Sequence, residues 1–255
     1  MEIAEHITTL AREGKRLAAA AEHGGLDVHI PTCPEWDMRD LVRHLSEIHL
    51  WAAAHVAQPH TKPWIDDLAE LTVFWPDLAV FWPNDDDLID WYLDTNTNLV
   101  GALESAPLDV ESFTFLPAPS PLAMWARRQA HETAVHRFDA ENAIGVASGF
   151  GPLFAADGID ELLVGFAPRR QEFPVASNQT MHVHAEDTEG HWQVTLGPDG
   201  ITTSREDGRA DVTLTGRASD LYLVLWNRGN DSSITVNGDR ELLEKWHGNH
   251  RIRWS

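Results

Sequence analysis

The segment from Pro121 to Asn142 constrains the fold most strongly, because its residues predict a long helix with chemically demanding side chains on its inner stripe. Glu132 and His136 are four residues apart, so a helix stacks them on one face. The same stripe is extended by Trp125, Gln129, Asp139 and Ala143. An unpaired buried carboxylate is costly, and a metal ion is one of the few partners that satisfies a carboxylate and an imidazole together. The alternative is a polar helix face turned to water, because a single Glu-x-x-x-His pair is a weak motif.

Composition and charge narrow the class of protein. The 255 residues are 43% hydrophobic and 23% charged, which is typical of a globular chain with one large domain or two small ones. The formal charge of −21 argues against nucleic acid and anionic membranes as partners, because both require a basic surface. Cys33 is the single cysteine, which excludes an internal disulfide and a multi-cysteine metal site.

The first residues and the hydropathy pattern predict a cytoplasmic location. Residues 1–6 contain neither the basic nor the apolar region of a signal peptide. No apolar run approaches the length of a membrane span.

Three further helices are predicted before residue 145, over residues 2–23, 38–56 and 85–105. Asp37 is a suitable N-cap for the second of them, with Asp40 at the acidic third position. His44 lies on one flank of that helix's apolar stripe, and His49 lies on the other. A histidine in such a place is either a hydrogen-bonded core residue or a metal ligand, and spacing leaves both interpretations open.

Four-helix bundles commonly hold metal sites in the core between facing helices. Two histidines and one glutamate make a three-ligand set with an open position, which is the pattern of a catalytic zinc rather than a structural one. Residues 57–84 are less regular and rich in tryptophan, with Trp64, Trp75 and Trp82. These aromatic side chains could line a ligand pocket or pack an irregular core segment.

Glycine and proline between residues 145 and 158 indicate a hinge, and an α+β pattern follows it. Helices are expected over residues 158–167, 219–227 and 239–246, and strands over 179–185, 191–196, 200–205, 210–216 and 233–236. Short turns between successive strands predict an antiparallel meander. His182 and His184 share one face of the first strand, and we expect them at the surface because no third ligand is evident.

Five segments carry a resemblance to a known family: residues 33–45, 127–141, 210–216, 223–228 and 236–239. Together they resemble the mycothiol-dependent maleylpyruvate isomerase family. The resemblance implies an α+β protein of two domains. Residues 1–148 would form a DinB-like, up-down four-helix bundle with a metal site. Residues 157–255 would form a small α+β domain, similar to sterol-carrier domains, with an antiparallel sheet.

The resemblance further implies a divalent metal, usually zinc, held by His44, Glu132 and His136. The open position would take water or the thiol of mycothiol, which loses its proton near neutral pH when bound to the metal. The thiolate would attack a small electrophilic substrate, either in cis-trans isomerisation or in S-transfer.

Other residues take supporting roles in this interpretation. Gln129 and Asp139 would orient the ligands, and Arg228 would hold a carboxylate of the substrate or cofactor in the cleft between the domains. Cys33 would be structural. The alternative from another class is a non-catalytic metal- or ligand-binding regulatory module.

Overall fold

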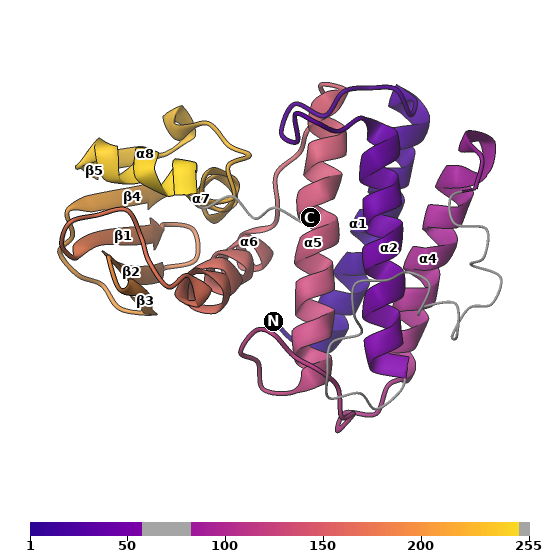
Figure 1. Cartoon of the computed structure of the whole chain (residues 1–255), viewed down its shortest axis with the longest axis horizontal. Helices are drawn as coiled ribbons and strands as arrows, with labels where there is room; N and C mark the ends of the chain where they lie inside the picture. Colours follow the sequence, from indigo (N-terminus) through magenta and orange to yellow (C-terminus); the bar gives the residue numbers. More distant parts are fainter. Residues whose placement is uncertain (58–82, 250–255) are drawn as a thin grey trace. The chain divides into compact units, whose positions relative to one another are not determined.

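The computed structural model describes residues 1–57 and 83–249, and the chain divides into two compact units, Met1–Ser148 and Gly149–Ser255 (Figure 1). The first unit is helical and the second combines helices with a sheet, so the chain has the expected α+β architecture. Trp64, Trp75 and Trp82 lie outside the described residues. In the described ranges, no helix has both the length and the apolar character needed to cross a lipid bilayer.

The first unit is a bundle of α1 (Ile3–Gly24), α2 (Met38–Ala57), α4 (Asp85–Ser105) and α5 (Pro121–Ala143). Helix α1 packs mainly against α5 and α4, and α2 packs mainly against α4 and α5, so α1 and α2 lie on a diagonal. Each of these helices begins and ends within two residues of its predicted bounds. The arrangement makes α2 and α5 neighbours, which places the two helices that carry the candidate ligands side by side.

Capping side chains fix where α2 and α5 begin. The Asp37 carboxylate accepts a hydrogen bond from the Asp40 amide, and the Asp40 carboxylate accepts one from the Asp37 amide, at 2.9 and 3.1 Å. This reciprocal pair satisfies two backbone donors at the start of α2 and confirms the predicted cap. Ser120 caps α5 by accepting from the Ala123 amide, and Pro121 occupies the first turn, where no amide proton is needed.

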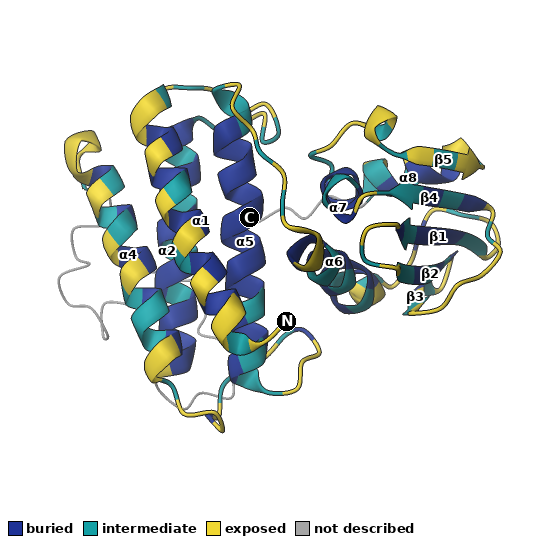
Figure 2. Cartoon of the chain, turned by 180° about the vertical axis from the view of Figure 1, so that it is seen from behind, coloured by how far each residue is buried: buried dark blue, intermediate teal, exposed yellow. Residues whose placement is uncertain are grey.

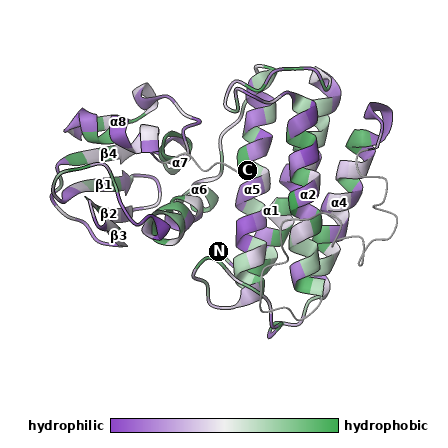
Figure 3. Ribbon diagram, viewed as in Figure 1, coloured by the Kyte–Doolittle hydropathy of each residue, from purple (hydrophilic) through white to green (hydrophobic). Residues whose placement is uncertain are grey.

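The bundle core is built from apolar side chains that recur at helical spacing. Hydrophobic and hydrophilic residues alternate along α1 and α2 (Figure 3), and the buried positions follow the same stripes (Figure 2). One cluster joins α1, α2, α4, α5 and the loop between α1 and α2, and includes Leu17, Ile30, Met38, Leu41, Leu45, Leu88, Tyr92 and Ala140. Burial of this surface holds α2 in register with α1 and α4.

A buried ionic network ties α1 to α5. The Arg137 side chain is fully buried, and its guanidinium donates to Glu13 at 2.6 Å and to Glu141 at 2.8 Å. Arg137 also donates to the Ser148 carbonyl at 2.6 Å, and Arg16 donates to Glu141 at 2.7 Å. These contacts fix the rotation of α5 relative to α1.

The second unit contains a five-stranded sheet in the order β3-β2-β1-β4-β5. Its strands are β1 (Gln179–Ala185), β2 (Gly190–Gly197), β3 (Gly200–Ser204), β4 (Val212–Gly216) and β5 (Thr235–Gly238). Its helices are α6 (Pro152–Asp160), η2 (Glu161–Phe166), η3 (Ala167–Arg169), α7 (Ala218–Leu225), η4 (Asp231–Ser233) and α8 (Arg240–Asn249).

Two details differ from the sequence prediction. The meander holds for β1, β2 and β3, but β4 pairs with β1 in parallel, because the chain after β3 crosses back to the other side of β1. The first helix begins at Pro152 instead of residue 158 and continues through a π-helical turn. Proline in a first helical turn signals such a start, so the pattern was present in the sequence.

The two faces of the sheet differ in chemistry. Alternate residues of β1, β2 and β4 are buried and apolar, including Met181, Val183, Trp192, Val194, Val212 and Leu214. The intervening residues on the opposite face are polar, and include His182, His184, His191, Gln193, Thr213 and Thr215. His182 is only 5% exposed, so the prediction that it is a surface residue was wrong.

We expect Arg137→Met to lower the free energy of unfolding by about 3 to 5 kcal/mol, because it leaves Glu13 and Glu141 without a buried cationic partner. Arg12→Met is the matched control, since Arg12 also contacts Glu13 but its side chain is 58% exposed. That control should lose less than about 1 kcal/mol. Urea unfolding measures both values. Equal losses would show that the contribution of the network to the free energy of unfolding does not depend on its burial.

His49 makes the stability of the bundle depend on pH. It is fully buried, lies against Tyr92 with ring centroids 5.5 Å apart, and is hydrogen-bonded to Thr133 at 2.9 Å. Burial lowers its pKa from 6.5 to about 3. Between these values the unfolded chain binds a proton that the folded chain does not, so stability falls as the pH falls through this window.

We expect the free energy of unfolding of the wild type, relative to that of His49→Gln, to fall by roughly 2 to 3 kcal/mol between about pH 6.5 and about pH 4.5. The comparison with His49→Gln removes the effect of the carboxylates, because both proteins contain the same ones. Urea titrations at each pH provide the measurement. A constant difference across this range would mean that His49 is not held neutral in the folded state.

Candidate metal centre

The bundle brings His44, Glu132 and His136 together. His44 lies on α2, and the other two side chains lie one turn apart on α5. One oxygen of Glu132, Oε1, is 3.4 Å from His44 Nε2 and 3.3 Å from His136 Nε2. The two imidazole rings are 5.2 Å apart and nearly perpendicular. The three side chains therefore converge on a single point in the core between α2 and α5.

This donor set fits a divalent transition metal. The three ligand atoms lie within 4.8 Å of one another. Bond lengths of about 2.0 to 2.1 Å in a tetrahedral zinc site place neighbouring ligand atoms about 3.3 Å apart, which is close to both distances measured from Glu132. Two imidazole nitrogens and one carboxylate oxygen are ligands that zinc accepts, and three protein ligands leave the fourth tetrahedral position for another molecule.

Groups around the three side chains orient them. The Nδ1 atom of His136 is 2.9 Å from Asp139 Oδ2, which turns Nε2 toward Glu132. Asp139 is in turn held by Thr32, whose hydroxyl donates to Oδ1 at 2.6 Å, and by the Cys33 thiol at 3.8 Å. A carboxylate behind a histidine in this way is the usual companion of a metal-bound imidazole.

Glu132 is held in its ionised form. Burial alone would raise the pKa of its carboxyl, but Arg128 and hydrogen bonds from His136 and His44 keep that pKa well below its usual range. Arg128 donates to Glu132 Oε2 at 2.7 Å. The second carboxylate oxygen is thus occupied, and Oε1 faces the two imidazoles.

The two imidazoles differ in their environments. Burial lowers the pKa of His44, against the opposing effect of its contact with Glu132. Burial would also lower the pKa of His136, but Asp139 and Glu132 raise it overall. The Trp36 ring covers both imidazoles, at centroid distances of 4.8 and 6.0 Å.

Sequence spacing identified part of this surrounding shell. Asp139 contacts His136 and orients its ring, as the position of Asp139 on the stripe suggested. Gln129 is buried on the same helix, and its Oε1 atom has no hydrogen-bond partner among the described residues. Arg128 was not singled out, although its four-residue spacing from Glu132 was visible. Thr32 and Trp36 could not be found by spacing, because only the fold of their loop brings them to α5.

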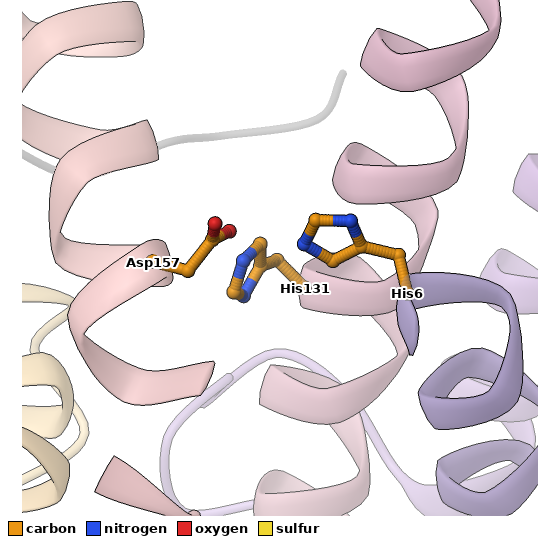
Figure 4. Close-up of side chains that lie close together, drawn as sticks. All are labelled: His6, His131 and Asp157. Carbon is orange, nitrogen blue, oxygen red and sulfur yellow. The ribbon is translucent and has the colours of Figure 1, made fainter. Parts of the chain in front are cut away.

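Other sequence candidates lie elsewhere. His49 faces the core but contacts Thr133 instead of the convergent set. Arg228 belongs to the second unit, in the turn after α7, where Asn227 adopts a left-handed backbone with φ of 60°. Its guanidinium donates to the Trp226 carbonyl at 3.0 Å. A further histidine pair, which spacing had not indicated, joins α1 to α5: His6 and His131 lie edge to face, 6.0 Å apart (Figure 4).

Comparisons with known proteins agree with this architecture. The family model for the mycothiol maleylpyruvate isomerase N-terminal domain matches residues 7–141, and the model for the MDMPI C-terminal domain matches residues 154–245. Among curated proteins, none matches the chain significantly.

Among solved structures, the chain is similar to a mycothiol-dependent maleylpyruvate isomerase and to a mutant of that protein. Each comparison gives 14% identity, a TM-score of 0.63 and coverage of 93% of both chains. At this level of identity the likeness concerns the fold. With both family models matched along its length, this chain belongs to the mycothiol-dependent maleylpyruvate isomerase family.

Proposed function

We propose that this protein is a metal-dependent enzyme that uses mycothiol as a thiol cofactor toward a small electrophilic substrate. The metal is a divalent ion, zinc, held by His44, Glu132 and His136. The reaction is a cis-trans isomerisation like that of maleylpyruvate isomerase, or an S-transfer. The observation that carries this proposal is the convergence of both imidazole Nε2 atoms on one oxygen of the ionised Glu132.

The chemistry follows from the charges around the site. When bound, the metal supplies positive charge that lowers the pKa of a thiol at the open position, so that the thiolate forms near neutral pH. Arg128 keeps Glu132 ionised and leaves Oε1 facing the imidazoles. Asp139 fixes the ring of His136 so that Nε2 points to the same place. The Trp36 ring lies beside both imidazole rings.

Cys33 supports the site and does not act as the nucleophile in this proposal. Its thiol is within 3.8 Å of Asp139, on the side of His136 that faces away from Glu132. Cys33, His136 and Asp139 also lie close enough to share an ion. However, Thr32 and His136 already bond the two oxygens of Asp139, so this carboxylate is better suited to orient His136 than to bind metal.

The test compares His44→Gln with His49→Gln. Both variants remove one histidine from α2, but only His44 belongs to the proposed ligand set. We expect the His44 variant to contain one equivalent of zinc per chain less than the wild type, and the His49 variant to contain as much as the wild type. Elemental analysis after gel filtration gives both numbers.

Turnover is measured on the same proteins with mycothiol and either maleylpyruvate or a model electrophile. We expect the His44 variant to lose roughly 100-fold or more in rate, because even groups that only support a metal ligand account for about 10- to 100-fold. Unchanged metal content in the His44 variant would overturn the ligand set. If the His44 variant loses its metal but the wild type shows no mycothiol-dependent turnover, the result would favour the non-catalytic binding module.

Arg228 is proposed to bind a carboxylate of the substrate or cofactor, because its planar guanidinium suits two-point contact with a carboxylate. We expect Arg228→Gln to raise KM for a carboxylate-bearing substrate by roughly tenfold or more, without changing metal content. Arg217→Gln is the control, since Arg217 lies in the same unit and its side chain is 75% exposed. Steady-state kinetics would contradict the assignment if both variants behaved alike.

A further inference from the structure

Three imidazoles gather on the polar face of the sheet in the second unit. His182 and His184 alternate along β1, and His184 is directly opposite His191 on β2 in the strand register. The ring of His191 is parallel to both neighbours, with centroids 4.2 Å from His184 and 5.3 Å from His182. Strand pairing therefore supplies the third histidine that the sequence of β1 by itself did not indicate.

An acidic side chain completes the group. Asp207 lies in the loop between β3 and β4, and its Oδ1 atom is 3.5 Å from His182 Nε2 and 4.0 Å from His191 Nδ1. The two imidazole nitrogens are 3.2 Å apart. His182, His191 and Asp207 thus present three ligand atoms within 4.8 Å of one another.

The triangle of distances is close to that of a tetrahedral zinc site. Ligand atoms bound at about 2.0 to 2.2 Å in a tetrahedral site lie about 3.3 to 3.6 Å apart. Two of the three separations, 3.2 and 3.5 Å, are close to this range. The longest distance involves Asp207, whose side chain is 76% exposed, so a small movement of its loop closes the set. Two imidazoles and one carboxylate are ligands that suit zinc, copper and nickel.

The surroundings of the two histidines hold their rings in place. His182 is only 5% exposed, and its Nε2 atom lies beside His191 Nδ1 and Asp207 Oδ1. His191 is 29% exposed and stacks on His184, which supports its ring from one side. A bound cation would contact His182, His191 and Asp207 at the same time.

We propose that His182, His191 and Asp207 form a second divalent metal site, for zinc or a similar transition metal, on the open face of the sheet. A bound ion would join β1 and β2 to the loop that precedes β4, with its remaining position open to solvent. This site belongs to the second unit and does not depend on the function proposed for the bundle, because the two sets share no residue.

The experiment uses the full chain with His44→Gln, so that the bundle set does not contribute to binding. Zinc is titrated in competition with a chromogenic chelator. We expect one equivalent to bind, and we expect His191→Gln or Asp207→Asn, added to this parent, to weaken binding by roughly tenfold or more. The Asp207 variant guards against misfolding, since its side chain is largely exposed.

His184→Phe is the matched control, because it keeps a flat ring against His191 but has no nitrogen atom that could bind metal. Its zinc affinity should stay close to that of the parent. The proposal would be overturned if the parent bound no zinc, or if neither His191→Gln nor Asp207→Asn reduced its affinity for zinc. A loss in His184→Phe as large as in His191→Gln would reject this ligand set.

Hydrogen exchange supplies a second readout in the same proteins. Zinc should slow amide exchange in residues 205–211 of the parent, because the ion would hold this loop against the sheet. The same addition should leave exchange unchanged in Asp207→Asn. Equal protection in both proteins would show that zinc acts elsewhere.

Discussion

The proposed metal site of the bundle depends on the contacts that the buried carboxylate of Glu132 makes. A lone carboxylate in a protein core is unfavourable, and here it is balanced by Arg128 on one oxygen and by two imidazoles on the other. This balance keeps the group ionised. It also fixes which oxygen faces His44 and His136. A cation at that point would complete a charge pattern that the protein itself has arranged.

The fold holds this pattern in place through contacts outside the site. The reciprocal caps of Asp37 and Asp40 define the start of α2 and hence the position of His44 along it. The Arg137 network sets the rotation of α5 against α1. The caps and the Arg137 network are distant in sequence. The caps position His44, and the network positions the helix that carries Glu132 and His136. Precision of this kind requires rigid elements more than loops.

The two units arrange polar groups by different means. In the bundle, polar side chains are buried on α5, and among them Asp139 and Arg137 are held by partners in the loop before α2 and on α1. In the sheet, strict alternation sends apolar residues to the core face and histidines to the other face. The same alternation that builds the core therefore also concentrates imidazoles, because residues opposite each other in paired strands share a face.

The sequence by itself determined the helices of the bundle, the strands β1 to β3, and the pairing of Glu132 with His136, because these follow from local periodicity and caps. The choice of His44 over His49 came from the family resemblance, since spacing allowed both. Only the tertiary structure decided that Thr32 and Trp36 surround the site and that β4 lies parallel to β1. The approach of Asp207 and His191 to His182 was decided in the same way. Each of these depends on which elements pack together, and the periodicity of one segment carries no information about the segment it will meet.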